Sequence, residues 1–299
     1  MLQPQRIPLK THLEYFIGDC RAANLSPRTI DYYRDKLLRF LSWAALAGVS
    51  HIDDVTPHVL RAYLTYLQES HSAGGVDAYW RAISAFLSFL ERDDVLAVNP
   101  LRKLRRPKVD RPLQAPIAIA DIRAMLATCK GGGVLDRRDA AIIHVLLDTG
   151  VRAGELTRLN IADVDFATGV VAIHKAKSRK GREVFVSAVT RRALRAYLRM
   201  RSDDKPLFLT HGTGGEHRIT YDGLRSAIES RADKARIALP QLHAFRRTFA
   251  ITSWRNGVDV TAIARMMGHG SLPVVMRYIA AETSDLAAIH DEHAPTGNL

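Results

Sequence analysis

The sequence predicts a mainly α-helical protein of two domains, with one small β-hairpin in the second. At 299 residues, the chain is long enough for two separate cores. Residues 11–94 show helical spacing of apolar side chains throughout, whereas residues 99–116 contain four prolines, which interrupt any helix. We therefore expect domains over 1–101 and 117–299, joined by a linker over 102–116.

The N-terminal half carries clear helix signals. In SPRTIDYYRDKLLRFLSW, Ser26 suits the N-cap and Pro27 the first helical position. The apolar residues expected on one face of this helix are Ile30, Tyr33, Leu37 and Leu41. Two further helices are predicted over 56–69 and 77–92, with HSAGG (71–75) as the loop between them. Short helices with short loops predict a small bundle.

The interdomain segment is strongly basic. Residues 102–111, RKLRRPKVDR, hold six basic residues and one acidic residue, a net charge of +5, whereas residues 1–101 sum to −1. The whole chain carries +12, an excess typical of proteins with a polyanionic partner. A solvated linker explains the basic run equally well, because charge-rich segments flanked by proline often stay extended in water.

The second half alternates helices with one hairpin. Helices are predicted over 121–129 and 136–150, the latter closed by Gly150. Residues 169–178 and 182–188 read as the strands of a hairpin, with RKG between them. Further predicted helices are 187–201, one after Pro240 that ends at Asn256 and Gly257, one over 259–268 capped by Asp259, and one over 271–281 capped by Ser271.

Composition excludes several classes of protein. The chain has no apolar run near the roughly 18 residues that suggest a membrane span. Its opening lacks a signal-peptide core, so we expect it to stay in the cytoplasm. Cys20 and Cys129 lie far apart and predict neither a disulfide framework nor a zinc site. A glycine-rich phosphate loop and an acidic metal cluster are both missing, so no cofactor or metal is expected.

Three polar residues stand out in the second half. His243 and Arg246 are three positions apart on a predicted helix, so they share a face and can reach one phosphate together. Arg152 follows a glycine at a helix junction, and arginine grips phosphate oxygens bidentately. Taken singly, each of them is more often an ordinary structural or surface residue. Asp148 and Glu155 flank Arg152 and are expected to cap helices or to orient it.

Four motifs carry a resemblance to a known family. DTGVRAGELTRL (148–159), a lysine-bearing hairpin, HAFRRTF (243–249) and MGHGSLPVVMRY (267–278) resemble, in order and spacing, the tyrosine recombinases and phage-type integrases. The resemblance is strong over 113–285, and the N-terminal half matches only in helical pattern. It implies an N-terminal core-binding domain of the SAM-like, DNA-binding type and a C-terminal tyrosine-recombinase catalytic domain.

The resemblance implies a role for each site residue. Tyr278 is the nucleophile, Arg152 and Arg246 hold the scissile phosphate, and His243 lies beside them. The other two residues of the catalytic set are His269 and a lysine of the hairpin. For this lysine, Lys177 is favoured over Lys175 and Lys180. The chain departs from the family's usual residues at Arg247, Pro273, Val274 and Ala280, none of which belongs to the catalytic set.

This set of side chains suits phosphoryl transfer. A tyrosine hydroxyl has a pKa of about 10, so its attack at neutral pH needs nearby positive charge and a proton acceptor such as His243. Arg152 and Arg246 would stabilise the charge of the transition state. Lys177 would give a proton to the leaving 5′ oxygen, and His269 would hold the phosphate or the tyrosine in line. The covalent link conserves the phosphodiester's energy, so neither ATP nor a metal is needed.

The expected partner is double-stranded DNA with inverted half-sites. The resemblance implies a dimer on each site and a tetramer in the synapse, with a partner recombinase or an accessory protein as a further possibility. Residues 282–294 carry Leu286, Ala287 and Ile289 on one amphipathic stretch, which resembles the family's exchanged C-terminal helix; packing within the chain is the alternative. The predicted DNA contacts are Arg28, Arg81, Arg102, Lys103, Arg105 and Arg106.

Two other functions use some of the same features. A type IB topoisomerase or a hairpin resolvase shares the arginine, lysine and tyrosine chemistry, and a non-catalytic DNA-binding module would share only the basic helices. The ordered set of four motifs argues against the binding module. The chain's start runs directly into the helical domain, which favours Xer-type or transposon-encoded recombinases over integrases with a separate arm-binding domain.

Overall fold

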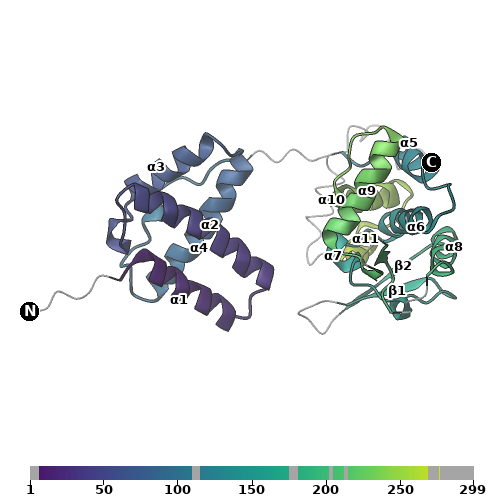
Figure 1. The fold of residues 1–299 in the computed structure, drawn as a ribbon, viewed down its shortest axis with the longest axis horizontal. Coiled ribbons are helices and arrows are strands. Elements are labelled where there is room, and N and C mark those ends of the chain that lie inside the picture. Colours follow the sequence, from purple (N-terminus) through teal and green to yellow (C-terminus); the bar gives the residue numbers. More distant parts are fainter. Residues whose placement is uncertain are drawn as a thin grey trace, which may run out of the picture. The chain divides into compact units, whose positions relative to one another are not determined.

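The computed structural model describes residues 7–109, 115–174, 181–201, 205–211 and 215–268, together with Met276. The chain forms two compact units, Met1–Pro112 and Leu113–Leu299 (Figure 1). Both are mainly helical, and the second holds short antiparallel strands, so the predicted fold class is confirmed. Within the described ranges, no helix combines the length and apolar character needed to cross a bilayer.

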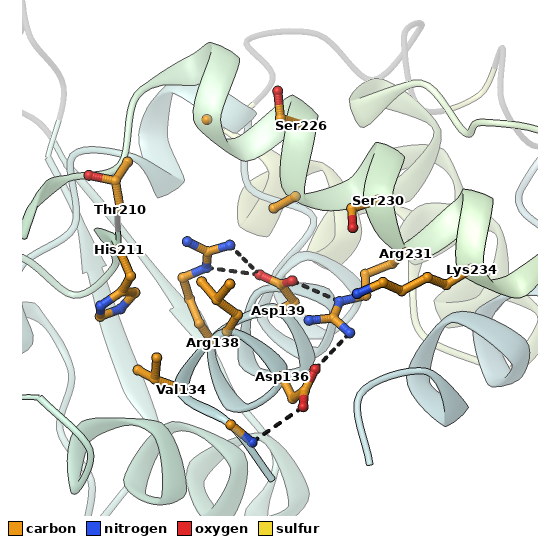
Figure 2. A pocket seen from close by; sticks show the side chains of 14 residues that line it. Val134, Asp136, Arg138, Asp139, Thr210, His211, Ser226, Ser230, Arg231 and Lys234 are labelled. Atoms are coloured by element: carbon orange, nitrogen blue, oxygen red, sulfur yellow. Dashed lines mark hydrogen bonds and ion pairs between the residues drawn. The ribbon is translucent and has the colours of Figure 1, made fainter. Parts of the chain in front are cut away.

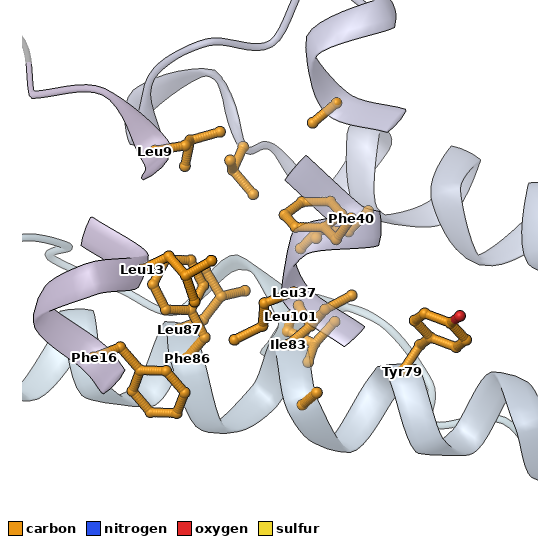
Figure 3. Close-up of a cluster of buried hydrophobic side chains, with 14 of the residues drawn as sticks. Leu9, Leu13, Phe16, Leu37, Phe40, Tyr79, Ile83, Phe86, Leu87 and Leu101 are labelled. Atoms are coloured by element: carbon orange, nitrogen blue, oxygen red, sulfur yellow. The ribbon is translucent and has the colours of Figure 1, made fainter. Parts of the chain in front are cut away.

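The first unit is a bundle of four helices. Its elements are α1 (Leu9–Ala22), α2 (Pro27–Leu46), α3 (Pro57–Gln68) and α4 (Ala73–Arg92), with 3-10 turns at Ile52–Asp54 and Pro100–Lys103. Ser26 caps α2 as predicted, because its hydroxyl accepts a hydrogen bond from the Thr29 N–H at 3.2 Å. The α4 helix contributes a continuous buried face to the core, which includes Phe86 and Leu87 and meets Phe16 and Leu37 (Figure 3).

One predicted loop in this unit is partly wrong. HSAGG was expected to separate two helices, but α4 begins at Ala73 and takes in both glycines. The cause is Ser72, whose hydroxyl accepts a hydrogen bond from the Gly75 N–H at 3.3 Å. This bond caps the helix before the two glycines. Glycine costs helix stability in the interior, but in the first turn the capping bond and the rest of the helix outweigh it.

The second unit is built around one buried helix. Its elements are α5 (Ile119–Ala127), α6 (Val134–Thr149), α7 (Ala153–Leu156), β1 (Val170–Ile173), β2 (Arg182–Phe185), α8 (Ala188–Leu198), β3 (Leu209–Thr210), β4 (His217–Arg218), α9 (Tyr221–Ala235), α10 (Leu242–Arg255) and α11 (Val260–Met267). The α6 helix contacts α8, α9, α10 and β2, and its Ile142, Ile143 and Leu146 are fully buried. Burying each such side chain contributes about 1.5–3 kcal/mol.

The hairpin and the helix ends agree closely with the predictions. The two strands pair antiparallel from Val170 with Phe185 to Ile173 with Arg182. The second strand is shorter than predicted, and residues 175–178 of the first predicted strand lie outside the described residues. Gly150 ends α6 in the left-handed conformation, and Asp259 caps α11 by accepting from two backbone N–H groups. The second hairpin, β3–β4, and the helix α9 were not predicted. The helix expected over 271–281 lies outside the described residues, apart from helical Met276.

Candidate active site

The site begins where α6 ends. Gly150 has a φ of 57°, and a Cβ there would collide with the ring of Phe249, so both conformation and space call for glycine. Val151 is buried, and Arg152 follows as the N-cap of α7. The Arg152 backbone N–H donates to the Glu155 carboxylate at 2.8 Å, while its side chain stays 42% exposed. The backbone is therefore held while the guanidinium remains open to a ligand.

Arg246 approaches the same junction from α10. Its side chain is buried, at 1% exposed. The guanidinium donates to the carbonyl oxygen of Gly150 and to that of Met267, the last residue of α11. One side chain thus joins the α6–α7 junction, α10 and the C-terminus of α11. The arginines singled out in the sequence, 94 residues apart, are brought to the same place.

His243 lies one turn before Arg246 on α10. It borders a cavity of about 470 Å³ that is also lined by Tyr221 and Arg225 of α9. His243 is exposed to solvent, although the surrounding protein partly buries its imidazole. This partial burial, together with the positive charges of Arg246, Arg247 and Arg152, lowers the pKa of His243. The ring is therefore neutral at neutral pH and able to accept a proton.

Glu155 connects two arginines. Its carboxylate accepts from Arg152 Nη1 at 3.1 Å, and from Arg182 Nη1 and Nη2 at 2.9 and 2.7 Å. Burial alone would raise its pKa, but the hydrogen bonds from Arg182 and from the Arg152 backbone outweigh burial and lower the pKa to about 2. The sequence prediction that Glu155 caps a helix and pairs with Arg152 is confirmed. Arg182 was not predicted to be part of the site.

The ionised Glu155 should make stability depend on pH. Its pKa falls from an ordinary 4.5 to about 2 on folding, so its contribution is complete above pH 4.5 and is lost as pH falls through about 2. The shift corresponds to about 3 kcal/mol. We expect Glu155→Gln to lower the free energy of unfolding most at neutral pH, and the gap to wild type to close between pH 4.5 and 2. Urea unfolding of both proteins across that pH range measures the difference in their free energies of unfolding.

Glu183→Gln is the matched control, since Glu183 is exposed on β2 beside Arg182. Its effect should stay within about 0.5 kcal/mol. A Glu155→Gln gap of the same size at pH 7 and at pH 3 would contradict the assignment.

Asp148, the other acidic residue that flanks Arg152, binds the start of α8. Its carboxylate accepts from the Ser187 N–H at 2.7 Å and from the Thr190 hydroxyl at 2.6 Å. Asp148 therefore caps α8, which is one of the two roles predicted for it. The α6 and α8 helices pack together, which brings the end of one beside the start of the other.

Several predicted site residues lie outside the described part of the chain. They are Lys177 with its alternatives Lys175 and Lys180, His269, Tyr278, the departures Pro273, Val274 and Ala280, and the tail 282–294. The described structure reaches both ends of the lysine-bearing turn, at His174 and Gly181, and reaches Gly268, the residue before His269.

Three of the predicted DNA-binding arginines are paired within the first unit. Arg106 donates twice to Asp77, at 2.7 and 3.2 Å, and Arg81 lies 3.4 Å from the same carboxylate, which is 1% exposed. Arg102 pairs with Glu91 at 2.6 Å. The basic run is therefore held against the first unit as far as Arg106. Lys103 and Arg105 are exposed, and Arg28 lies in the first turn of α2.

A second cavity of the second unit lies away from the described residues of the candidate active site. It has a volume of about 590 Å³ and lies between the start of α6 and α9, with none of the predicted catalytic residues in its lining (Figure 2). Asp139 accepts from Arg138 at 2.8 Å and from Arg231 at 2.7 Å, and Arg231 also pairs with Asp136 at 2.8 Å. These ion pairs join α6 to α9, so the cavity wall has a structural role.

Comparisons with known proteins identify the family of the chain. A model described as the phage integrase family matches residues 117–284, and one described as the phage integrase N-terminal SAM-like domain matches 13–96. The tyrosine recombinase XerC of Oceanobacillus iheyensis is 29% identical over 286 residues, covering 92% of each chain. The crystal structure of XerA recombinase is 26% identical with a TM-score of 0.54, covering 96% of this chain and 99% of that one.

A third comparison concerns the fold alone. A lambda integrase dimer bound to a core site is 12% identical, with a TM-score of 0.74, over 91% of this chain and 77% of that one. The family model covers more than half of the chain, and the named relatives are recombinases, so the topoisomerase and binding-module alternatives are not favoured. The chain belongs to the phage integrase family and is a tyrosine-type site-specific recombinase.

Proposed function

We propose that the chain cuts and rejoins DNA through a covalent bond between Tyr278 and a 3′ phosphate. The observation that carries this proposal is the meeting of Arg152, His243 and Arg246 at the junction of α6 with α7. The motif order supplies Tyr278 as the nucleophile, since it follows His269 by nine residues.

The proposed reaction is an exchange of one phosphoester for another. The tyrosine oxygen bonds to phosphorus, the bond from phosphorus to the 5′ oxygen breaks, and neutral His243 takes up the phenolic proton. The exposed Arg152 guanidinium and Arg246 stabilise the charge on the non-bridging oxygens. Lys177 gives its proton to the 5′ oxygen, and His269 holds the reacting groups in line. Rejoining reverses these steps, without ATP or metal.

Double-stranded DNA with inverted half-sites is the proposed substrate. The lambda integrase structure, which is a dimer on a core site, supports one protomer per half-site. Two such sites would join as a tetramer, with residues 282–294 reaching a neighbouring protomer. A second recombinase or an accessory protein could complete the assembly, and the cytoplasm is the proposed location.

Among the predicted contacts, Lys103 and Arg105 are the best placed to reach the DNA backbone, because both are exposed on the basic run. Arg28, at the first turn of α2, would face the groove. Arg81, Arg102 and Arg106 would have to leave a carboxylate first. Each phosphate neutralised should lower the logarithm of the binding constant by about 0.9 per decade of salt.

A nicked DNA that carries a candidate site tests the proposal, because loss of the short released strand traps the covalent complex. Wild-type protein is expected to form a complex that survives denaturing gels, with the linkage mapped to Tyr278 by mass spectrometry. Tyr278→Phe should bind the DNA with unchanged Kd but form no linkage.

Tyr221→Phe is the matched control, since Tyr221 is exposed beside His243 and lies outside the proposed chemistry. It should link DNA like the wild type. Linkage through any residue other than Tyr278 would overturn the assignment. Relaxation of supercoiled DNA without exchange between two sites would favour topoisomerase chemistry.

A further inference from the structure

Arg182 was not predicted to belong to the site, yet it contacts two other elements of it. It is the first residue of β2, and its side chain is 9% exposed. Two of its nitrogens donate to Glu155, and Nε donates to the Met266 carbonyl oxygen at 2.7 Å. One guanidinium therefore joins three elements: the strand that follows the lysine-bearing turn, the α7 helix after Arg152, and the end of α11.

The contact with Glu155 controls the charge available at Arg152. Glu155 is 9% exposed and ionised, and both arginines share it. With both present, the three side chains sum to one positive charge. Without Arg182, a buried carboxylate would face Arg152 alone, and bidentate pairing would draw the guanidinium onto it. Arg182 thereby leaves the charge of Arg152 free for a phosphate.

The contact with α11 controls a different part of the site. Arg182 binds the Met266 carbonyl, and Arg246 binds that of Met267. Gly268 follows with a φ of 61°, and a Cβ there would lie 2.8 Å from Arg182 Cδ. The last turn of α11 thus packs directly against the Arg182 side chain, and the chain then continues into His269.

We propose that Arg182 is a positioning residue for strand cleavage: it keeps Arg152 available to the scissile phosphate and sets the end of α11 from which His269 follows. The inference rests on the proposed function. It gives Arg182 no contact with the reacting atoms, so its effect must pass through its neighbours.

Single-turnover cleavage of nicked DNA tests whether Arg182 keeps Arg152 available to the phosphate. We expect Arg182→Gln to slow the formation of the phosphotyrosyl link by about 100-fold or more, while the Kd for DNA changes little. Arg182→Lys retains the charge but not the three-way geometry, so it should recover part of the rate. Adding Glu155→Gln to Arg182→Gln removes the carboxylate that would otherwise hold Arg152, so the double variant should cleave faster than Arg182→Gln alone.

A neutral substrate gives an independent readout. When a methylphosphonate replaces the scissile phosphate, one anionic oxygen is gone and Arg152 has less charge to stabilise. The ratio of wild-type to Arg182→Gln rates should therefore shrink on this substrate. A purely structural defect would slow both substrates alike.

Arg218→Gln is the matched control for stability. Arg218 is also a partly buried arginine of this unit, and it donates to the carbonyl oxygens of Thr157 and Leu159, away from Glu155. Equal slowing by Arg218→Gln and Arg182→Gln, or a double variant no faster than Arg182→Gln, would overturn the inference. Failure of wild-type protein to form the Tyr278 link would instead overturn the proposed function.

Discussion

Arg246→Gln is expected to lower the rate of DNA cleavage by about 100- to 1,000-fold, in the range found when one preorganised donor to a transition state is removed. It should also destabilise the fold, because glutamine leaves the carbonyl oxygens of Gly150 and Met267 buried without their donor. Each unsatisfied group costs about 1–3 kcal/mol. Single-turnover cleavage and urea unfolding measure the two effects separately.

Arg246→Lys separates charge from geometry. Lysine retains the positive charge, but its single ammonium lacks the planar fork that spans two carbonyls. We expect a smaller loss of stability than for glutamine and a rate between that of glutamine and wild type. Arg255→Gln is the control, because Arg255 is exposed at the last turn of the same helix. A wild-type cleavage rate in Arg246→Gln would remove Arg246 from the site.

Arg231→Gln is expected to cause the largest loss of stability, about 3–5 kcal/mol. Arg231 is 2% exposed and donates to Asp139 at 2.7 Å (Figure 2). It also donates to the Thr128 carbonyl oxygen at 2.8 Å. Its removal leaves Asp139, itself 2% exposed, to pair with Arg138. The midpoint of urea unfolding should fall, while protein that remains folded should still cleave DNA.

Lys234→Gln is the matched control, since Lys234 lies one turn later on α9 and is exposed. Its effect should stay within about 0.5 kcal/mol. A comparable loss in both variants would mean that the ion pairs of Arg231 contribute little beyond a surface charge.

Much of the local structure was predictable because it depends on residues within one turn of each other. Ser26 and Asp259 cap helices by bonding to N–H groups two or three residues ahead, and Gly150 ends α6 in a conformation that favours glycine. HSAGG shows the limit of the same reasoning: the glycines indicated a loop, but the Ser72 cap extended the helix over them.

The choice of partners for charged groups was not predictable from sequence. Asp148 was expected either to cap a helix or to pair with Arg152, and it caps α8 by accepting from Ser187, 39 residues further on. Arg106 was predicted to contact DNA, and in the structure it binds the buried Asp77, 29 residues earlier. In each case several donors or acceptors were available along the chain, and packing of helices decided which of them came within hydrogen-bonding distance.

The sequence by itself determined the two-unit helical fold, most helix ends, the family, and the pairing of His243 with Arg246 on one face of a helix. These follow from short-range spacing and from motif order. Only the tertiary structure decided that Arg152 shares Glu155 with Arg182, and that Arg246 and Arg182 hold the end of α11. The contacts that Arg182 makes with Glu155 and Met266, and that Arg246 makes with Met267, join residues from 21 to 84 positions apart, so they exist only once α6, α10, α11 and the hairpin have packed.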